Sequence, residues 1–152
     1  VAAGDIDTLS TDHCAFTPEQ KELGRSCFDT LPGIPGVQTL LPLVYTYGVA
    51  TGIITVGQMA EMMCASPARL FGLSHRKGRI APGLDADIVI LDPTVRRRLS
   101  GAQLLSRAGY TPYEGMEVSC EAREVYLRGR LVAAHGRFCG ACGAGEFVRA
   151  SA

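Results

Sequence analysis

The sequence lacks net charge, any long uninterrupted apolar run and a secretion signal. Its 152 residues carry 15 Lys and Arg against 15 Asp and Glu, so the formal net charge is zero. Because nucleic-acid binding proteins usually need an excess of basic residues, this balance argues against such a partner. Gly, Pro or charged residues interrupt every apolar stretch well before the ~20 residues that a membrane span requires. No signal peptide precedes the first apolar run. We therefore expect a soluble, cytoplasmic protein that binds neither nucleic acid nor membrane.

An initiator methionine is also missing, and we take the chain to be the C-terminal part of an enzyme. Its size is about that of one domain, with 47% hydrophobic residues. Six cysteines are scattered, and only Cys139 and Cys142 have C-x-x-C spacing. Without a secretion signal we expect reduced thiols. A zinc site built on this pair would need a second pair of ligands, so we interpret the spacing as coincidental.

The most informative segment is Thr11 to Cys14, which places Asp12 and His13 at the end of the short run of residues 6–10. We expect this run to be a buried strand. Strand ends in parallel α/β sheets and barrels are where catalytic groups lie. Without further support, an Asp at such an end is more often a turn or cap residue. We interpret His13 as an orienting residue rather than a metal ligand, and Cys14 as a small buried hydrophobe.

Helical signals follow between residues 17 and 70. Thr17 and Pro18 are typical of the first positions of a short helix. Apolar spacing over residues 37–49 predicts a helix, which Pro42 must delay or kink. Thr55 is the expected N-cap of a stronger helix, followed by a short one from Ser66. The methionines of the stronger helix share one face and are predicted to be core: Met59, Met62 and Met63.

The apolar period changes from helical to β beyond residue 76. A short strand is expected to end at Ile80, and residues 86–92 form a β-rich run that Pro93 ends. Strands on either side of Gly129 predict a hairpin. The Gly-rich residues 136–152 have little capacity to bury surface, so we expect an extended or partly disordered arm. Three consecutive arginines, Arg96 to Arg98, are interpreted as a solvated charge run.

Five segments of the chain, in this order, match a known family. On these segments the chain resembles the C-terminal third of the cyclic amidohydrolases, and it is most similar to hydantoinases and dihydropyrimidinases. The segments are STDHCAFTPEQK (residues 10–21), LVYTYGV (43–49), SPARLFGL (66–73), KGRIAPGLDADIV (77–89) and YEGM (113–116).

The resemblance implies an α/β fold class: the C-terminal part of a metal-dependent (β/α)8 TIM-like barrel, plus the C-terminal strands of a small composite β-sandwich. On this map residues 1–76 are the last barrel strand and the closing helices, with residues 1–12 as the eighth strand. Residues 77–135 are the C-terminal share of the sandwich with an inserted helical segment. Residues 136–152 are the Gly-rich tail.

The same resemblance implies two divalent metal ions, usually zinc, held mostly by residues outside this chain: a His-x-His pair, a carbamylated lysine and two further histidines. Asp12 would contact one metal and act as general base and then acid, with His13 supporting it. The implied substrate is a small cyclic amide, a hydantoin or dihydropyrimidine ring. The implied assembly is a homo-oligomer, tetramer or dimer.

Two departures from the family pattern affect the substrate assignment. Pro32 and Gly33 stand where hydantoinase-like members have an Asn-Gly whose main chain helps hold the substrate, and proline has no N–H to donate. Gln38 and Leu40 stand where a Glu-x-Arg segment is common. An allantoinase or dihydroorotase-like enzyme is therefore one alternative. A catalytically inert structural homologue of the collapsin response mediator type, or an inactive fragment, is the other.

Overall fold

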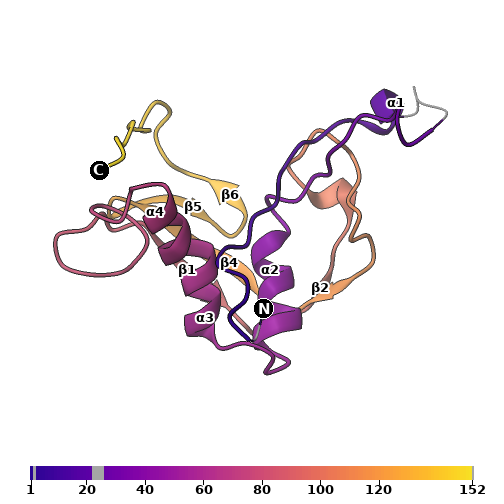
Figure 1. Cartoon of the computed structure of the whole chain (residues 1–152). Helices are drawn as coiled ribbons and strands as arrows, with labels where there is room; N and C mark the ends of the chain where they lie inside the picture. The colour runs from indigo at the N-terminus through magenta and orange to yellow at the C-terminus, as the bar shows by residue number, and fades with distance from the viewer. Residues whose placement is uncertain (2, 22–25, 152) are drawn as a thin grey trace.

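The computed structural model describes residues 1, 3–21 and 26–151, and it places a helical layer against a small antiparallel sheet (Figure 1). The helices are α1 (Pro18–Lys21), α2 (Leu40–Val44), α3 (Val56–Ala60) and α4 (Ser66–Leu70). The π-helical segment η1 (Tyr45–Val49) continues α2, and η2 (Glu61–Ala65) joins α3 to α4. The strands are β1 (Ile88–Asp92), β2 (Arg97–Arg98), β3 (Glu117–Val118), β4 (Glu121–Leu127), β5 (Arg130–Ala134) and β6 (Arg137–Phe138), with a 3-10 turn η3 (Gly101–Gln103) between β2 and β3.

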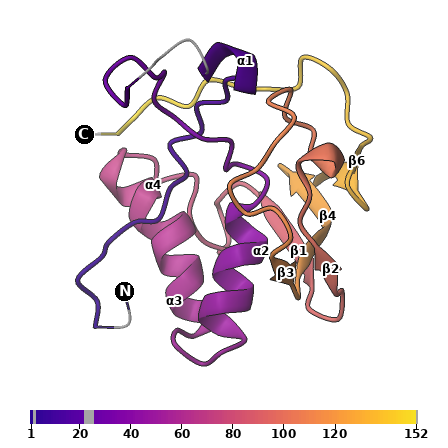
Figure 2. The ribbon, with the colours of Figure 1, turned by 90° about the vertical axis from the view of Figure 1, so that its right-hand side faces the viewer.

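Two of the predicted helix starts, at Thr17 and at Thr55, are confirmed by reciprocal capping. Thr55 accepts from the backbone N–H of Gln58, whose side chain accepts from the backbone N–H of Thr55 in return. Thr17 and Gln20 repeat this exchange at α1. Each arrangement pairs backbone N–H groups that no helical carbonyl can reach. The helix after Thr55 then continues through α3, η2 and α4 to Leu70 and lies beside α2 (Figure 2).

Pro42 delays α2 as predicted, because the helix begins at Leu40 rather than at residue 37. In this position the proline falls in the first turn, where a backbone N–H has no helical acceptor in any case. The chain then continues as η1, and the Thr46 hydroxyl accepts from the backbone N–H of Ser119 at 2.9 Å. This bond joins the helical layer to the segment between β3 and β4.

The four-stranded sheet has the order β1-β4-β5-β6, with all neighbours antiparallel. The predicted hairpin is confirmed: Arg128 and Gly129 join β4 to β5 with φ of 48° and 75°. Positive φ at both residues is typical of a two-residue hairpin turn that follows the natural twist of its strands. His135 and Gly136 repeat the pattern before β6, with φ of 49° and 72°.

Two predicted strands are wrong. Residues 6–10 have no regular secondary structure, and the backbone N–H of Leu9 bonds to the carbonyl of Met62 in the helical layer instead. A strand forms only beside a partner strand, and the described residues provide none for this segment. Ile80 also lies outside any strand and is 82% exposed.

The tail is not a loose arm, as we had expected. Its first residues form β6. Near its end, the backbone N–H of Ser151 donates to the carbonyl of Gly72 at 2.8 Å. Between these points the Glu146 carboxylate lies 3.3 Å from Arg128 and 3.5 Å from Arg76. The Gly-rich tail therefore folds back along the protein. Hydrogen bonds and ion pairs hold it in place, since it has few apolar side chains to bury.

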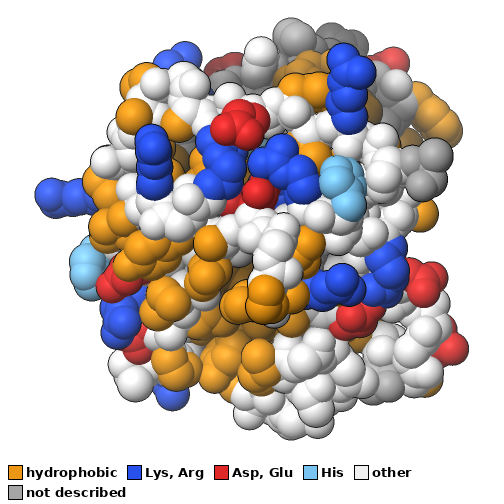
Figure 3. Space-filling view, turned by 90° about the vertical axis from the view of Figure 1, so that its left-hand side faces the viewer, with side chains coloured by type: hydrophobic (Ala, Val, Ile, Leu, Met, Phe, Trp, Pro, Cys, Tyr) orange, Lys and Arg blue, Asp and Glu red, His pale blue; other side chains and the backbone are white. Residues whose placement is uncertain are grey.

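The apolar core is small for the length of the chain. Met59 and Met62 are 5% and 6% exposed and pack with Ile54, which confirms the predicted core face of the helix. The accessible surface is 10123 Å². A compact monomer of this 16.1 kDa mass exposes roughly 7,400 Å². Hydrophobic side chains gather on the face in Figure 3, and the described residues form no closed barrel.

No helix in the described part of the chain is both long and apolar enough to cross a bilayer.

Candidate functional site

Backbone and side-chain hydrogen bonds hold residues 12–14 against the loop of residues 32–37. We call this contact the clamp. The backbone N–H of Cys14 donates to the carbonyl of Ile34 at 3.2 Å, and His13 and Ile34 form an isolated parallel bridge. The imidazole Nδ1 of His13 accepts from the backbone N–H of Gly36 at 3.0 Å and of Val37 at 3.2 Å. Two of the predicted site segments, about twenty positions apart in sequence, are thus brought side by side.

Asp12 itself is exposed at the end of its segment, and its φ of 44° is in the left-handed region. Asp tolerates this region better than most residues, but the conformation is uncommon and often found at functional positions. The backbone N–H of the next residue, His13, donates to the Thr11 hydroxyl at 3.2 Å and supports the turn. Within the described residues the Asp12 carboxylate makes no hydrogen bond or ion pair, so it is available to a ligand.

Gly33 is required by the clamp. Its φ is 117°, and a Cβ built on it would lie 2.5 Å from the Cβ of Cys14. No side chain fits at that separation. Cys14, which we predicted to be buried, is instead exposed, although Gly33 lies close beside it. Pro32 directly precedes this contact and offers a carbonyl but no N–H.

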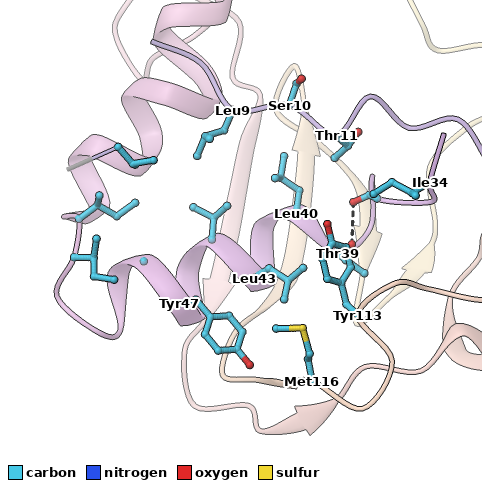
Figure 4. A pocket seen from close by; sticks show the side chains of 16 residues that line it. Leu9, Ser10, Thr11, Ile34, Thr39, Leu40, Leu43, Tyr47, Tyr113 and Met116 are labelled. Atoms are coloured by element: carbon cyan, nitrogen blue, oxygen red, sulfur yellow. Dashed lines mark hydrogen bonds between the residues drawn. The ribbon is translucent and has the colours of Figure 1, made fainter. Parts of the chain in front are cut away.

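A cavity of about 670 Å³ lies next to the clamp (Figure 4). Ser10 and Thr11 line it from the N-terminal segment, and Leu40, Leu43 and Tyr47 line it from α2 and η1. Tyr113 and Met116 contribute from the YEGM segment. Asp12 is not part of the lining, although its neighbour Thr11 is. The walls are mainly apolar, so the cavity suits an apolar group.

The YEGM segment owes its shape to Glu114, a role that the sequence match did not reveal. The Glu114 carboxylate accepts from the backbone N–H of Gly101 at 2.7 Å. This hydrogen bond, and then a second one from the Ser100 hydroxyl, lower the pKa of the Glu114 carboxyl. The backbone N–H of Leu99 also donates to the carbonyl of Met116 at 2.9 Å. These contacts fix the turn that brings Tyr113 and Met116 to the cavity wall.

Reasoning from sequence also missed an ion-pair network formed by Arg76 and the KGRIAPGLDAD segment of residues 77–87. Asp85 lies 2.8 Å from Lys77 and 2.9 Å from Arg76, and Lys77 also pairs with Asp87. Hydrogen bonds from Lys77 and then Arg76 lower the pKa of Asp85. Asp87 in turn accepts from the backbone N–H of Arg128 at 2.8 Å. The network therefore joins this loop to the β4-β5 turn, and the basic and acidic residues at the two ends of the segment were its only signal.

The donor atoms at the clamp fit part of a metal centre. Across residues 1, 3–21 and 26–151, no group of three or more His, Cys, Asp or Glu side chains is placed to hold a metal ion. Asp12 provides one hard oxygen donor, which is suitable for a divalent cation. A metal bound at Asp12 would need its remaining ligands from elsewhere.

Comparison with known proteins identifies the family. The model of the amidohydrolase family matches residues 1–132, and the chain belongs to this family. It is 38% identical over 151 residues to D-phenylhydantoinase of Escherichia coli K12, an alignment that covers 98% of this chain and 33% of the relative. The chain thus spans about a third of the length of the curated relatives it matches.

Solved structures of similar proteins have the same arrangement. The D-hydantoinase (dihydropyrimidinase) of a Thermus species matches with a TM-score of 0.93 and 38% identity, over 98% of this chain and 33% of that one. Dihydropyrimidinase of Brevibacillus agri NCHU1002 matches with a TM-score of 0.94 and 37% identity, over 99% and 33%. The helical layer, the clamp and the sheet therefore correspond to about one third of a hydantoinase structure.

Proposed function

We propose that this chain contributes the C-terminal third of a cyclic amidohydrolase that opens a hydantoin or dihydropyrimidine ring. The observation that supports this most strongly is the match to hydantoinase structures with a TM-score of 0.93 at 38% identity. On this proposal residues 1–76 belong to the barrel and residues 77–135 to the sandwich. The names of the relatives favour this ring class, and none of the alternatives gains more support.

Asp12 is the general base and then the general acid of the proposed reaction. Two bound divalent metal ions, zinc being the expected one, would polarise the ring carbonyl and lower the pKa of water. The Asp12 carboxylate takes the proton released by the attacking water and delivers it to the ring nitrogen as the C–N bond breaks. Without this proton the nitrogen would have to leave as a strongly basic anion. Its exposure and lack of partners among the described residues suit Asp12 to this transfer.

His13 is a positioning residue in this scheme. Its Nδ1 accepts from Gly36 and Val37, so a neutral ring carries its hydrogen on Nε2. The imidazole thereby fixes the distance between Asp12 and the loop that begins at Pro32 and Gly33. We assign the main chain of these two residues to substrate contact, with the Pro32 carbonyl as the available acceptor. A homo-oligomeric assembly in the cytoplasm remains our expectation.

The test uses the protein in which these residues occur together with the remaining metal ligands. Asp12→Asn should lower turnover of hydantoin and dihydrouracil by roughly 10² to 10⁴-fold, the usual contribution of a general acid-base group. Asp7→Asn is the matched control, since Asp7 is an exposed carboxylate of the same segment, and it should keep full turnover. Near-normal turnover of Asp12→Asn would overturn the assignment. Loss of bound metal in Asp12→Asn, measured by metal analysis, would support a contact between Asp12 and the metal.

A further inference from the structure

A second cavity, also of about 670 Å³, lies between residues 35–42 and the four-stranded sheet. It shares Gly36 and Thr39 with the cavity of Figure 4, but the remaining walls differ. Val125, Ala133 and Phe138 line it from the sheet. These apolar residues come from three neighbouring strands and form a broad surface. Of the residues assigned to the proposed ring-opening reaction, His13 lines this cavity, whereas Asp12, Pro32 and Gly33 do not.

Arg97 lines the cavity with a donor that has no partner. Its Nε is buried and makes no hydrogen bond to any of the described residues. The neighbouring Arg98 instead pairs with Glu117 at 3.0 Å, because alternate residues of β2 point to opposite sides. A buried guanidinium N–H without an acceptor is unfavourable, and it is satisfied when an acceptor binds. The Nε edge of a guanidinium fits a carboxylate with two parallel hydrogen bonds.

The other charged groups around this cavity also favour a single negative charge. Arg137 lies in the lining and forms no ion pair within the described part of the chain. His13 contributes its imidazole, whose Nε2 side is left to donate because Nδ1 accepts from the backbone. Glu121 is the acidic residue among the described lining residues, and it can accept from an N–H group of a ligand.

We propose that this cavity binds a small carboxylate carrying an apolar group and an amide-type N–H. The carboxylate pairs with Arg97 Nε, the N–H donates to Glu121, and the apolar group packs on Val125 and Phe138. N-carbamoylated and N-acylated amino acids have this chemistry. The ring-opened product of a hydantoin belongs to this class, but the inference from Arg97 holds without the proposed reaction.

Calorimetric titration of the full chain with N-carbamoylphenylalanine tests this site. The acid should bind, and the matched carboxamide, which lacks the negative charge, should bind at least about tenfold more weakly. This comparison needs no substitution and so does not depend on the folding of a variant. Arg97→Gln should weaken binding of the acid by about tenfold. Arg79→Gln removes the same charge from an exposed residue outside the cavity and should bind as the unsubstituted protein does.

Three outcomes would overturn the inference: equal binding of the acid and the carboxamide, unchanged affinity in a folded Arg97→Gln variant, or no binding of the acid at millimolar concentration. Asp12→Asn separates this site from the proposed reaction. It should strongly lower ring opening and leave the affinity for N-carbamoylphenylalanine unchanged. Binding without activity would therefore refute the proposed function alone, and activity without binding would refute the carboxylate site alone.

Discussion

The Nδ1 atom of His13 accepts the backbone N–H of Gly36 at 3.0 Å, across 23 positions of sequence. A second N–H, from Val37, shares the same acceptor at 3.2 Å. One side chain thus satisfies two backbone donors and holds the loop beside Asp12. An acceptor at this position, rather than a positive charge or a ring, is what the loop requires.

Replacement of His13 tests this requirement. His13→Ala should lower the free energy of unfolding by roughly 1 kcal/mol, because two backbone N–H groups lose their acceptor. His13→Asn should recover part of the loss, since the asparagine Oδ1 lies close to where the histidine places Nδ1. Urea unfolding followed by circular dichroism measures both. His75→Ala, at an exposed histidine, is the control. Equal stability of His13→Ala and the unsubstituted chain would show that the clamp contributes nothing.

Gly33→Ala should destabilise the clamp for two separable reasons. The φ of 117° is strained for alanine, and the added Cβ would meet Cys14 Cβ at 2.5 Å. Gly4→Ala shares only the first reason, because its φ is 82° but no atom lies within 4 Å. We expect a loss of about 1 kcal/mol for Gly4→Ala and of roughly 2 to 3 kcal/mol for Gly33→Ala. Similar losses in urea unfolding would mean that the loop moves away from Cys14 at little cost.

The capping box at Thr55 predicts a smaller effect. Thr55→Ala should cost about 1 kcal/mol, since the backbone N–H of Gln58 loses its acceptor. Thr55→Ser keeps the hydroxyl and should retain most of the stability. Thr8→Ala is the control in the same urea titration, because Thr8 lies outside any helix or strand and its hydroxyl bonds to none of the described residues. A loss in Thr55→Ser as large as in Thr55→Ala would attribute the effect to something other than the hydroxyl.

Sequence predicted the parts of this fold that depend on neighbours close in the chain. The N-caps Thr17 and Thr55, the position of Pro42 and the hairpin at Gly129 all follow from a few consecutive residues, and all are confirmed. The strand expected at residues 6–10 is wrong, because a strand depends on a partner that can lie anywhere in a protein. For the same reason, the residues of a short segment could not show whether it is paired.

The candidate site was likewise predictable from the sequence only in part. Asp12 and His13 were singled out by their position after residues 6–10, and the family resemblance gave their roles and added Pro32 and Gly33. The structure brings the two segments together. Their roles remain predictions. The bond from Gly36 to His13, the support of Glu114 for Gly101 and the contacts of Arg97 could not be predicted, because each joins residues far apart in sequence or depends on which side of a strand is buried. The tail after residue 136 was misjudged because composition does not reveal contacts such as that of Ser151 with Gly72.

The ion pairs of Asp85 predict a pH dependence of stability. Hydrogen bonds from Lys77 and Arg76 hold the pKa of Asp85 below its ordinary value, which is about 3.9 in an unfolded chain. A lowered pKa in the folded state means that the stabilisation is fully present above the ordinary pKa and is lost as pH falls through the folded-state pKa.

Asp85→Asn should therefore be less stable than the unsubstituted chain at pH 7, and the two should converge as pH falls below about 4. Urea midpoints between pH 7 and pH 3 measure the difference. Asp7→Asn, whose carboxylate is exposed and forms no ion pair with a described residue, should follow the unsubstituted chain throughout. A constant gap between Asp85→Asn and the unsubstituted chain over this range would show that the carboxylate acts through packing rather than through its charge.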